Sequence, residues 1–243
     1  MLCFHGYGQH AVYFQALGEK LSNEYTLISI NLFYHGRSSW PDCETALTPE
    51  SLSSLISEFL KHLELERFSI CGYSLGGKII LSLIEKLADC IDEILLIAPD
   101  GIQTNFWYSM ATYPYWMRRL FHYTIRHPQL FFRLSSLMKE LGILHKGVLK
   151  FARTQMNTQE KREKVYCTWL TYRKIRPNIP KVAYQINQHQ IRTTIFLGSF
   201  DRIITQKSTE PLLRHIHHYD LHILQTGHNS LINDVSRIKE SIF

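Results

Sequence analysis

The stretch CGYSLGG, residues 71–77, decides the fold because it places a serine between two segments of different periodicity. The preceding RFSI is strand-like, and the following KIILSLIEKL has apolar residues at helical spacing. Gly72 and Gly76 flank Ser74 and give the pattern G-x-S-x-G. On a sharp strand-to-helix turn, such a serine has a strained backbone that exposes its hydroxyl group. The alternative is an ordinary glycine turn that happens to contain a serine.

Strand and helix patterns alternate on both sides of this turn. The segment 48–63 opens with Thr48 as a predicted N-cap, Pro49 at the first helical position and Ser51 at the third. Strands alternating with helices predict an α/β fold, with a mostly parallel sheet that carries helices on both faces. The expected strands are 1–4, 25–33, 67–74, 91–101, 191–201 and 220–228, and the expected helices are 11–22, 48–63, 78–87, 208–219 and 229–243.

The middle of the chain breaks this alternation. Residues 103–190 read as several amphipathic helices and contain fifteen Lys or Arg against three Glu, a formal charge of +12, whereas the remainder carries −6. This asymmetry predicts a separate helical cap, 103–190, inserted into an α/β core of residues 1–102 and 191–243. The basic residues of the cap are expected to form a solvated face, or to attract an anionic substrate or, weakly, an anionic membrane surface.

The composition of the chain indicates its cellular location and the state of its cysteines. No apolar run reaches the roughly 18 residues of a membrane helix, and the opening MLCFHGYG lacks the features of a signal peptide. We therefore expect a soluble cytoplasmic protein. The five cysteines are scattered and form no C-x-x-C pair, so free thiols are expected rather than disulfides or a zinc site.

A serine hydroxyl needs a base to activate it, and the base needs an acid to orient it. Asp201 in GSFDRII lies at the carboxyl end of one predicted strand segment, and His228 in TGHNSL lies at the carboxyl end of the next. Because the carboxyl ends of parallel strands meet at one edge of a sheet, both side chains are expected near Ser74. The histidines at 215, 217, 218 and 222 have irregular spacing and few acidic neighbours, so no metal site is predicted there.

A transition-state oxyanion needs backbone N–H donors. The N–H group of Leu75, directly after the serine, is one candidate. A second is expected from the turn after an early strand, where Gly6 and Gly8 let the backbone bend and direct the N–H group of Tyr7 toward the site.

The chain resembles the α/β-hydrolase superfamily, and within it the single-domain serine hydrolases with a helical cap. The resemblance implies that Ser74 is the nucleophile, His228 the base, Asp201 the acid, and Tyr7 and Leu75 the oxyanion donors. Some relatives keep the acid after the preceding strand, at the position of Asp100. The motifs that carry the resemblance are HGYG (5–8), HGRS (35–38), GYSLGG (72–77), LIAPDG (96–101), GSFDRII (198–204) and TGHNSL (226–231).

This resemblance implies hydrolysis of a carboxylic ester or thioester with an apolar acyl group, without a cofactor. Two alternatives are a carbon–carbon bond hydrolase with the same triad and a catalytically silent member that binds a small ligand. A nucleic-acid binder is not favoured, because the basic charge comes without a recognised nucleic-acid motif. The acyl pocket is expected to draw on cap aromatics at 106, 107, 108, 113, 115, 116, 121, 131 and 132.

The first strand departs from the family pattern. Such folds commonly have two strands before the one that ends in the HG turn, whereas Met1 begins almost inside that strand. The segment 25–33 is then expected to form an exposed edge of the sheet, which contains neither proline nor lysine to prevent pairing. The sequence therefore predicts either self-association through this edge or marginal solubility.

Overall fold

The structure is a computed structural model, and it describes all residues except 105, 130–153, 239–241 and 243. The chain divides into two compact units. The α/β unit comprises Met1–Ser38, Thr48–Gln103 and Ile175–Phe243, and the helical unit comprises Ser39–Leu47 and Thr104–Lys174. Compared with the predicted cap of 103–190, the helical unit ends earlier and gains the loop 39–47.

The described part of the α/β unit contains one six-stranded sheet, in the order β2-β1-β3-β4-β5-β6, with every neighbouring pair parallel. This sheet confirms the predicted α/β class. The turns after β1 and β3 are neighbours, because Phe4 pairs with Gly72. The strands are β1 (Leu2–Phe4), β2 (Ile28–Ile30), β3 (Phe68–Tyr73), β4 (Ile91–Ile97), β5 (Arg192–Gly198) and β6 (Asp220–Leu224).

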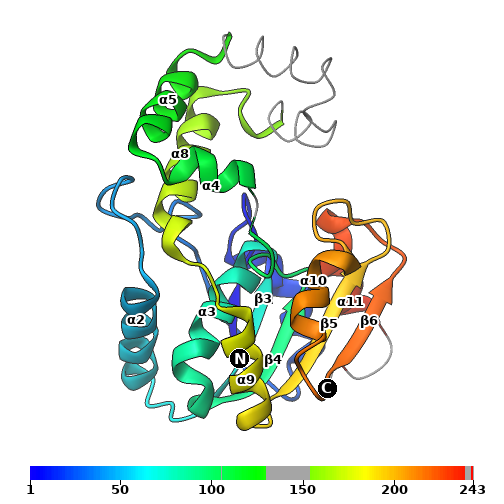
Figure 1. The fold of residues 1–243 in the computed structure, drawn as a ribbon. Helices are drawn as coiled ribbons and strands as arrows, with labels where there is room; N and C mark the ends of the chain where they lie inside the picture. Colours follow the sequence, from blue (N-terminus) through cyan, green and yellow to red (C-terminus); the bar gives the residue numbers. More distant parts are fainter. Residues whose placement is uncertain (105, 130–153, 239–241, 243) are drawn as a thin grey trace. The chain divides into compact units, whose positions relative to one another are not determined.

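Helices cover both faces of this sheet, as predicted. In Figure 1, α2, α3, α9 and α10 lie in front of the strands and α11 behind them. Helix α3 packs on α2 and α9, and α1 packs on α11. The helices of this unit are α1 (Gln15–Leu21, after a 3-10 turn at Ala11–Phe14), α2 (Pro49–His62), α3 (Leu75–Leu87), α9 (Ile179–Gln188), α10 (Gln206–Leu213) and α11 (Leu231–Arg237).

The start of α2 follows its sequence signal. The side chain of Thr48 accepts a hydrogen bond from the backbone N–H of Ser51 at 3.1 Å, and Pro49 is the first helical residue. The cap satisfies an N–H group that has no partner inside the helix, which confirms the predicted helix start.

Strand β2 is shorter than the predicted strand 25–33. The chain leaves the ladder early, because the N–H of Leu32 bonds to Nε2 of His5 at 3.0 Å and Tyr34 turns with φ 64°. At the other end, the N–H of Tyr25 still bonds to the carbonyl of Leu21 at the end of α1. The strand does lie at the edge of the sheet, as expected, while self-association through it stays a prediction.

The described part of the helical unit is held by bonds between its own elements. Its helices are α4 (Phe106–Thr112), α5 (Tyr115–Arg126) and α8 (Gln159–Thr171), followed by a 3-10 turn at Tyr172–Lys174. The Arg162 guanidinium on α8 donates to the carbonyls of Ile125 and Met156 at 2.6 and 3.1 Å. These bonds join α8 to the end of α5.

The prediction of free thiols was wrong for two of the five cysteines. Cys43 and Cys167 form a disulfide that links the loop 39–47 to α8 across 124 residues of sequence. The loop is also joined to the end of α8 by a bond from the N–H of Leu47 to the carbonyl of Thr171 at 2.8 Å. No spacing rule could reveal this pair, because tertiary packing brings it together. Cys3, Cys71 and Cys90 remain free.

Candidate active site

Ser74 occupies the sharp turn between β3 and α3. Its backbone has φ 51° and ψ −113°, an unusual conformation for a residue other than glycine. Glycine is required on both sides of it. A Cβ at Gly72 would lie 2.7 Å from the carbonyl of Gly76, and a Cβ at Gly76 would lie 1.8 Å from the carbonyl oxygen of Phe4. Side chains at these two positions would therefore crowd the neighbouring helix and strand.

The three residues predicted as a triad are brought together at the carboxyl edge of the sheet. Nε2 of His228 lies 3.0 Å from Oγ of Ser74, and Nδ1 of His228 lies 2.6 Å from Oδ2 of Asp201. The Asp201 side chain is fully buried, whereas 12% of the His228 side chain is exposed. The arrangement forms one continuous line of hydrogen bonds from a buried carboxylate to a partly accessible hydroxyl group.

The hydrogen bonds of Asp201 fix the orientation of the histidine. Oδ1 of Asp201 accepts the backbone N–H groups of Ile203 and Ile204 at 2.8 and 2.9 Å, so Oδ2 is left to face the imidazole. A carboxylate can only accept, and Nδ1 of His228 must therefore donate. In the neutral ring, this leaves Nε2 as the acceptor for the proton of Ser74.

Tyr73 is a positioning residue that the sequence analysis did not single out. Its hydroxyl group donates to the backbone carbonyl of His228 at 2.6 Å, and its ring stacks on the imidazole at 5.3 Å between centroids. Burial, and then the nearby charge of Asp201, raises the pKa of Tyr73, so the phenol stays protonated as a donor. Its place as the first x of G-x-S-x-G was the available signal.

The two residues predicted as oxyanion donors lie in neighbouring turns. The N–H group of Leu75 is the first amide of α3, so it has no acceptor within the helix. Tyr7 lies in the turn after β1, which is shaped by a bond from the N–H of Gly6 to Oε1 of Gln9 at 3.0 Å. The N–H of Gly8 is held by Nε2 of His35 at 3.0 Å. The histidine of the HGRS motif thus helps to hold the turn that carries Tyr7.

Asp100, the alternative acid, has different partners. Its backbone N–H donates to the carbonyl of Ser74 at 2.9 Å, and its charge acts on the buried ammonium group of Lys78. Burial lowers the pKa of Lys78 to about 8, against the opposing effect of Asp100. The carboxylate that bonds His228 belongs to Asp201.

Within the described residues, no group of three or more His, Cys, Asp or Glu is placed to hold a metal ion. In the histidine cluster, Nδ1 of His215 bonds the carbonyl of Pro211, and the ring of His222 stacks on Phe196. Nor does any described helix have the length and apolar character needed to cross a bilayer.

The aromatic residues expected to line an acyl pocket have varied surroundings. Tyr108 and Tyr113 use their hydroxyl groups to bond the carbonyls of Trp169 and Arg173 inside the helical unit. Phe106, Trp107 and Trp116 are 65%, 54% and 64% exposed. Phe131 and Phe132, also expected to line the pocket, lie outside the described residues. The pocket stays a prediction.

The fold and this site define a hydrolase of the α/β class. The chain matches the alpha/beta hydrolase fold family over residues 1–235, and it belongs to that family. The resemblance stated from the sequence motifs is thereby confirmed.

Individual relatives are more distant. An uncharacterised protein of Mycobacterium tuberculosis is 25% identical over 116 residues, which are 47% of this chain and 33% of the relative. The pimeloyl-[acyl-carrier protein] methyl ester esterase of Nitrosomonas europaea is 28% identical over 98 residues, 40% of this chain and 36% of that protein. The alignments thus cover about a third of the curated relatives' own length.

Solved structures share the fold over almost the whole chain. A thermophilic esterase from Thermogutta terrifontis superposes with a TM-score of 0.67 at 18% identity, covering 97% of this chain and 85% of that one. The meta-cleavage product hydrolase CumD from Pseudomonas fluorescens gives a TM-score of 0.62 at 18% identity, covering 97% and 86%. At such identities, the likeness extends to the fold alone.

Proposed function

We propose that the protein is a serine hydrolase that cleaves a carboxylic ester or thioester through an acyl-enzyme intermediate. One observation carries the proposal: the line of hydrogen bonds from Oγ of Ser74 through the imidazole of His228 to the carboxylate of Asp201, at 3.0 and 2.6 Å. In this proposal Ser74 is the nucleophile, His228 the general base and Asp201 the residue that orients it.

In the first half of the reaction, Nε2 of His228 takes the proton of Ser74 as Oγ attacks the acyl carbon. The N–H groups of Leu75 and Tyr7 stabilise the resulting oxyanion. The tetrahedral intermediate collapses, and the alcohol or thiol leaves with the proton that His228 returns to it. In the second half, water attacks the acyl-enzyme in the same way and releases the acid. Asp201 stays ionised throughout and stabilises the imidazolium of each step.

The ester class is favoured because proteins named as esterases appear in two separate comparisons. The Nitrosomonas protein is named as an esterase acting on a methyl ester, and the Thermogutta structure is titled as an esterase. Carbon–carbon bond hydrolysis is the second candidate, because CumD shares the fold. A catalytically silent ligand-binding protein is the third, and only this last candidate predicts no reaction of Ser74 with a fluorophosphonate.

The test is a comparison of two alanine variants, Ser74→Ala and Ser199→Ala. The first removes the proposed nucleophile, while the second removes an exposed hydroxyl group whose one side-chain bond to a described residue is to Gln225. Hydrolysis of p-nitrophenyl esters of graded chain length, and labelling by a fluorophosphonate, should be lost in Ser74→Ala, with a fall in rate of about 10⁶-fold. Ser199→Ala should keep both. Near-normal turnover by Ser74→Ala would exclude Ser74 as the nucleophile.

Three further points belong to the proposed function. We propose that no metal or organic cofactor takes part, that the helical unit acts as a cap that contributes to an apolar acyl pocket, and that the protein is cytoplasmic. The Cys43–Cys167 disulfide is an observation against the last point, because disulfides are rare in the cytosol.

A further inference from the structure

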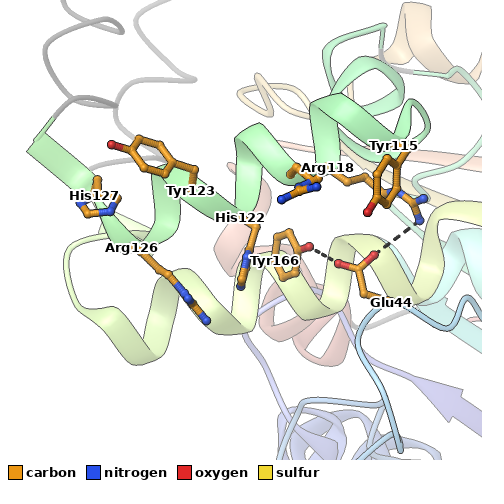
Figure 2. A pocket seen from close by; sticks show the side chains of 9 residues that line it. Glu44, Tyr115, Arg118, His122, Tyr123, Arg126, His127 and Tyr166 are labelled. Carbon is orange, nitrogen blue, oxygen red and sulfur yellow. Dashed lines mark hydrogen bonds and ion pairs between the residues drawn. The ribbon is translucent and has the colours of Figure 1, made fainter.

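The helical unit contains a cavity of about 640 Å³ that shares no residue with the Ser74 site. Helix α5 supplies most of its wall, α8 supplies Tyr166, and the loop 39–47 supplies Glu44 (Figure 2). In this view His122 and Arg126 project from α5 toward α8. The volume lies within the range of about 300–1,000 Å³ that is typical of small-molecule sites.

The side of α5 that lines the cavity is basic, because its basic residues recur at helical spacing. Arg118, His122 and Arg126 recur every four residues, and Arg119 lies in the adjacent row. Residues three and four apart lie on the same side of a helix, so these side chains form one continuous stripe. Among the described residues that line the cavity, only Glu44 carries a carboxylate.

The positive charge of this cavity is only partly compensated. Arg118 forms an ion pair with Glu44 at 3.5 Å, and the same carboxylate accepts the hydroxyl group of Tyr166. Within the described residues, Arg119 and Arg126 form no ion pair. Three guanidinium groups against one carboxylate leave a net charge of +2 when both lining histidines are neutral.

Arg118 is the most constrained of these groups. Its side chain is only 19% exposed, and its guanidinium carbon lies 5.6 Å from the centroid of the Tyr115 ring, within cation–π range. Its Nε is buried and has no hydrogen-bond partner among the described residues. A buried N–H donor without an acceptor is costly, and an oxygen atom of a bound anion is the kind of acceptor that such a donor lacks.

We propose that this cavity between α5 and α8, called the basic groove below, is a binding site for a small ligand. The ligand carries two or more negative charges on phosphate groups. Guanidinium groups bind phosphate oxygens through paired N–H donors, and the tyrosine rings of the wall suit a ligand with a flat organic part. A concave site of this volume fits a small molecule better than the surface of a membrane. The proposal is independent of the reaction at Ser74.

The test measures binding of inorganic pyrophosphate to the full chain by calorimetry at 50 mM and 200 mM NaCl. We expect saturable binding that weakens several-fold at the higher salt, because charge–charge attraction is screened. The double variant R119Q/R126Q should bind at least tenfold more weakly. Glu44→Gln should bind more tightly, because it removes the carboxylate that the described residues contribute to the cavity wall. The control Arg214→Gln removes an exposed arginine directly after α10 and should bind like wild type.

Melting temperatures of all variants show whether each one folds, and ester hydrolysis should be unchanged in each. The proposal is overturned if pyrophosphate fails to saturate, or if R119Q/R126Q binds as tightly as Arg214→Gln. It is also overturned if the groove variants lose co-sedimentation with vesicles containing phosphatidylserine while pyrophosphate does not bind, since the site would then be a membrane contact.

Discussion

Replacing Asp201 by asparagine tests the proposed mechanism most directly, because it exchanges one oxygen for an NH₂ group and preserves the shape of the side chain. The backbone N–H groups of Ile203 and Ile204 bond Oδ1 at 2.8 and 2.9 Å. In the variant only the amide oxygen can accept these bonds. The NH₂ group must therefore point toward Nδ1 of His228, where Oδ2 lies 2.6 Å away in the native protein.

An NH₂ group at that place reverses the roles of the imidazole nitrogens. Nδ1 of His228 becomes an acceptor, the ring proton moves to Nε2, and Nε2 then donates to Ser74 instead of accepting from it. A histidine in this tautomer cannot remove the serine proton. We expect kcat to fall by about 10⁴-fold, as for the same change in chymotrypsin-type triads, which is about 5.4 kcal/mol in the activation barrier.

The assay is the initial rate of p-nitrophenyl ester hydrolysis, with the melting temperature as a check on folding. The matched control is Asp100→Asn, because Asp100 also follows a strand of the sheet but acts on Lys78. Its rate should stay within tenfold of wild type. If Asp201→Asn kept a rate within tenfold of wild type while Asp100→Asn lost activity, the acid role would belong to Asp100.

Three further predictions concern stability and assembly. Replacing Cys43 and Cys167 by serine should lower the free energy of unfolding by about 5 kcal/mol, on the loop-closure estimate for 124 residues. In denaturant titrations, reductant should cause the same loss of stability in the wild type and none in the double variant. Burial lowers the pKa of Lys78 from 10.5 to about 8, so between these pH values the unfolded chain binds more protons than the folded chain. The free energy of unfolding should therefore rise with pH in this range, by at most about 3 kcal/mol. Lys78→Met should remove this rise, measured by urea unfolding at pH 7.5 and 10. Edge pairing through β2 predicts a dimer in sedimentation, and a wild-type monomer would contradict it. Ile28 donates its N–H to the carbonyl of Met1, so the N–H of the next residue, Ser29, points away from β1. Ser29→Pro removes this outward donor and should therefore yield monomers.

The sequence predicted those parts of the fold and the site that depend on local signals. The strand-to-helix turn at Ser74, the N-cap at Thr48 and the alternation that produced the parallel sheet are all periodic or positional patterns. Asp201 and His228 were found because each directly follows a strand. Parallel strands bring such residues to one edge whatever their separation in the chain.

The features that escaped prediction depend on packing between distant segments. The Cys43–Cys167 bond requires the loop 39–47 to dock on α8, and nothing in the spacing of the cysteines indicates it. The basic charge of the middle segment was evident, but its concentration in one groove depends on which face of α5 is turned to α8. The early end of β2 depends on a bond from Leu32 to a histidine side chain.

The bond from Tyr73 to the backbone carbonyl of His228 ties together two segments that two intervening strands, β4 and β5, separate in the sheet. The loop that carries His228 lies between strand β6 and the short helix α11, and loops open locally at a lower free energy than core strands. Any fluctuation that releases this loop breaks the Tyr73 bond and withdraws the imidazole from Ser74 at once. Amide hydrogen exchange at residues 226–230 should therefore report the fraction of molecules in which His228 contacts Ser74, and opening of this loop would control the proposed activity without contacting the substrate.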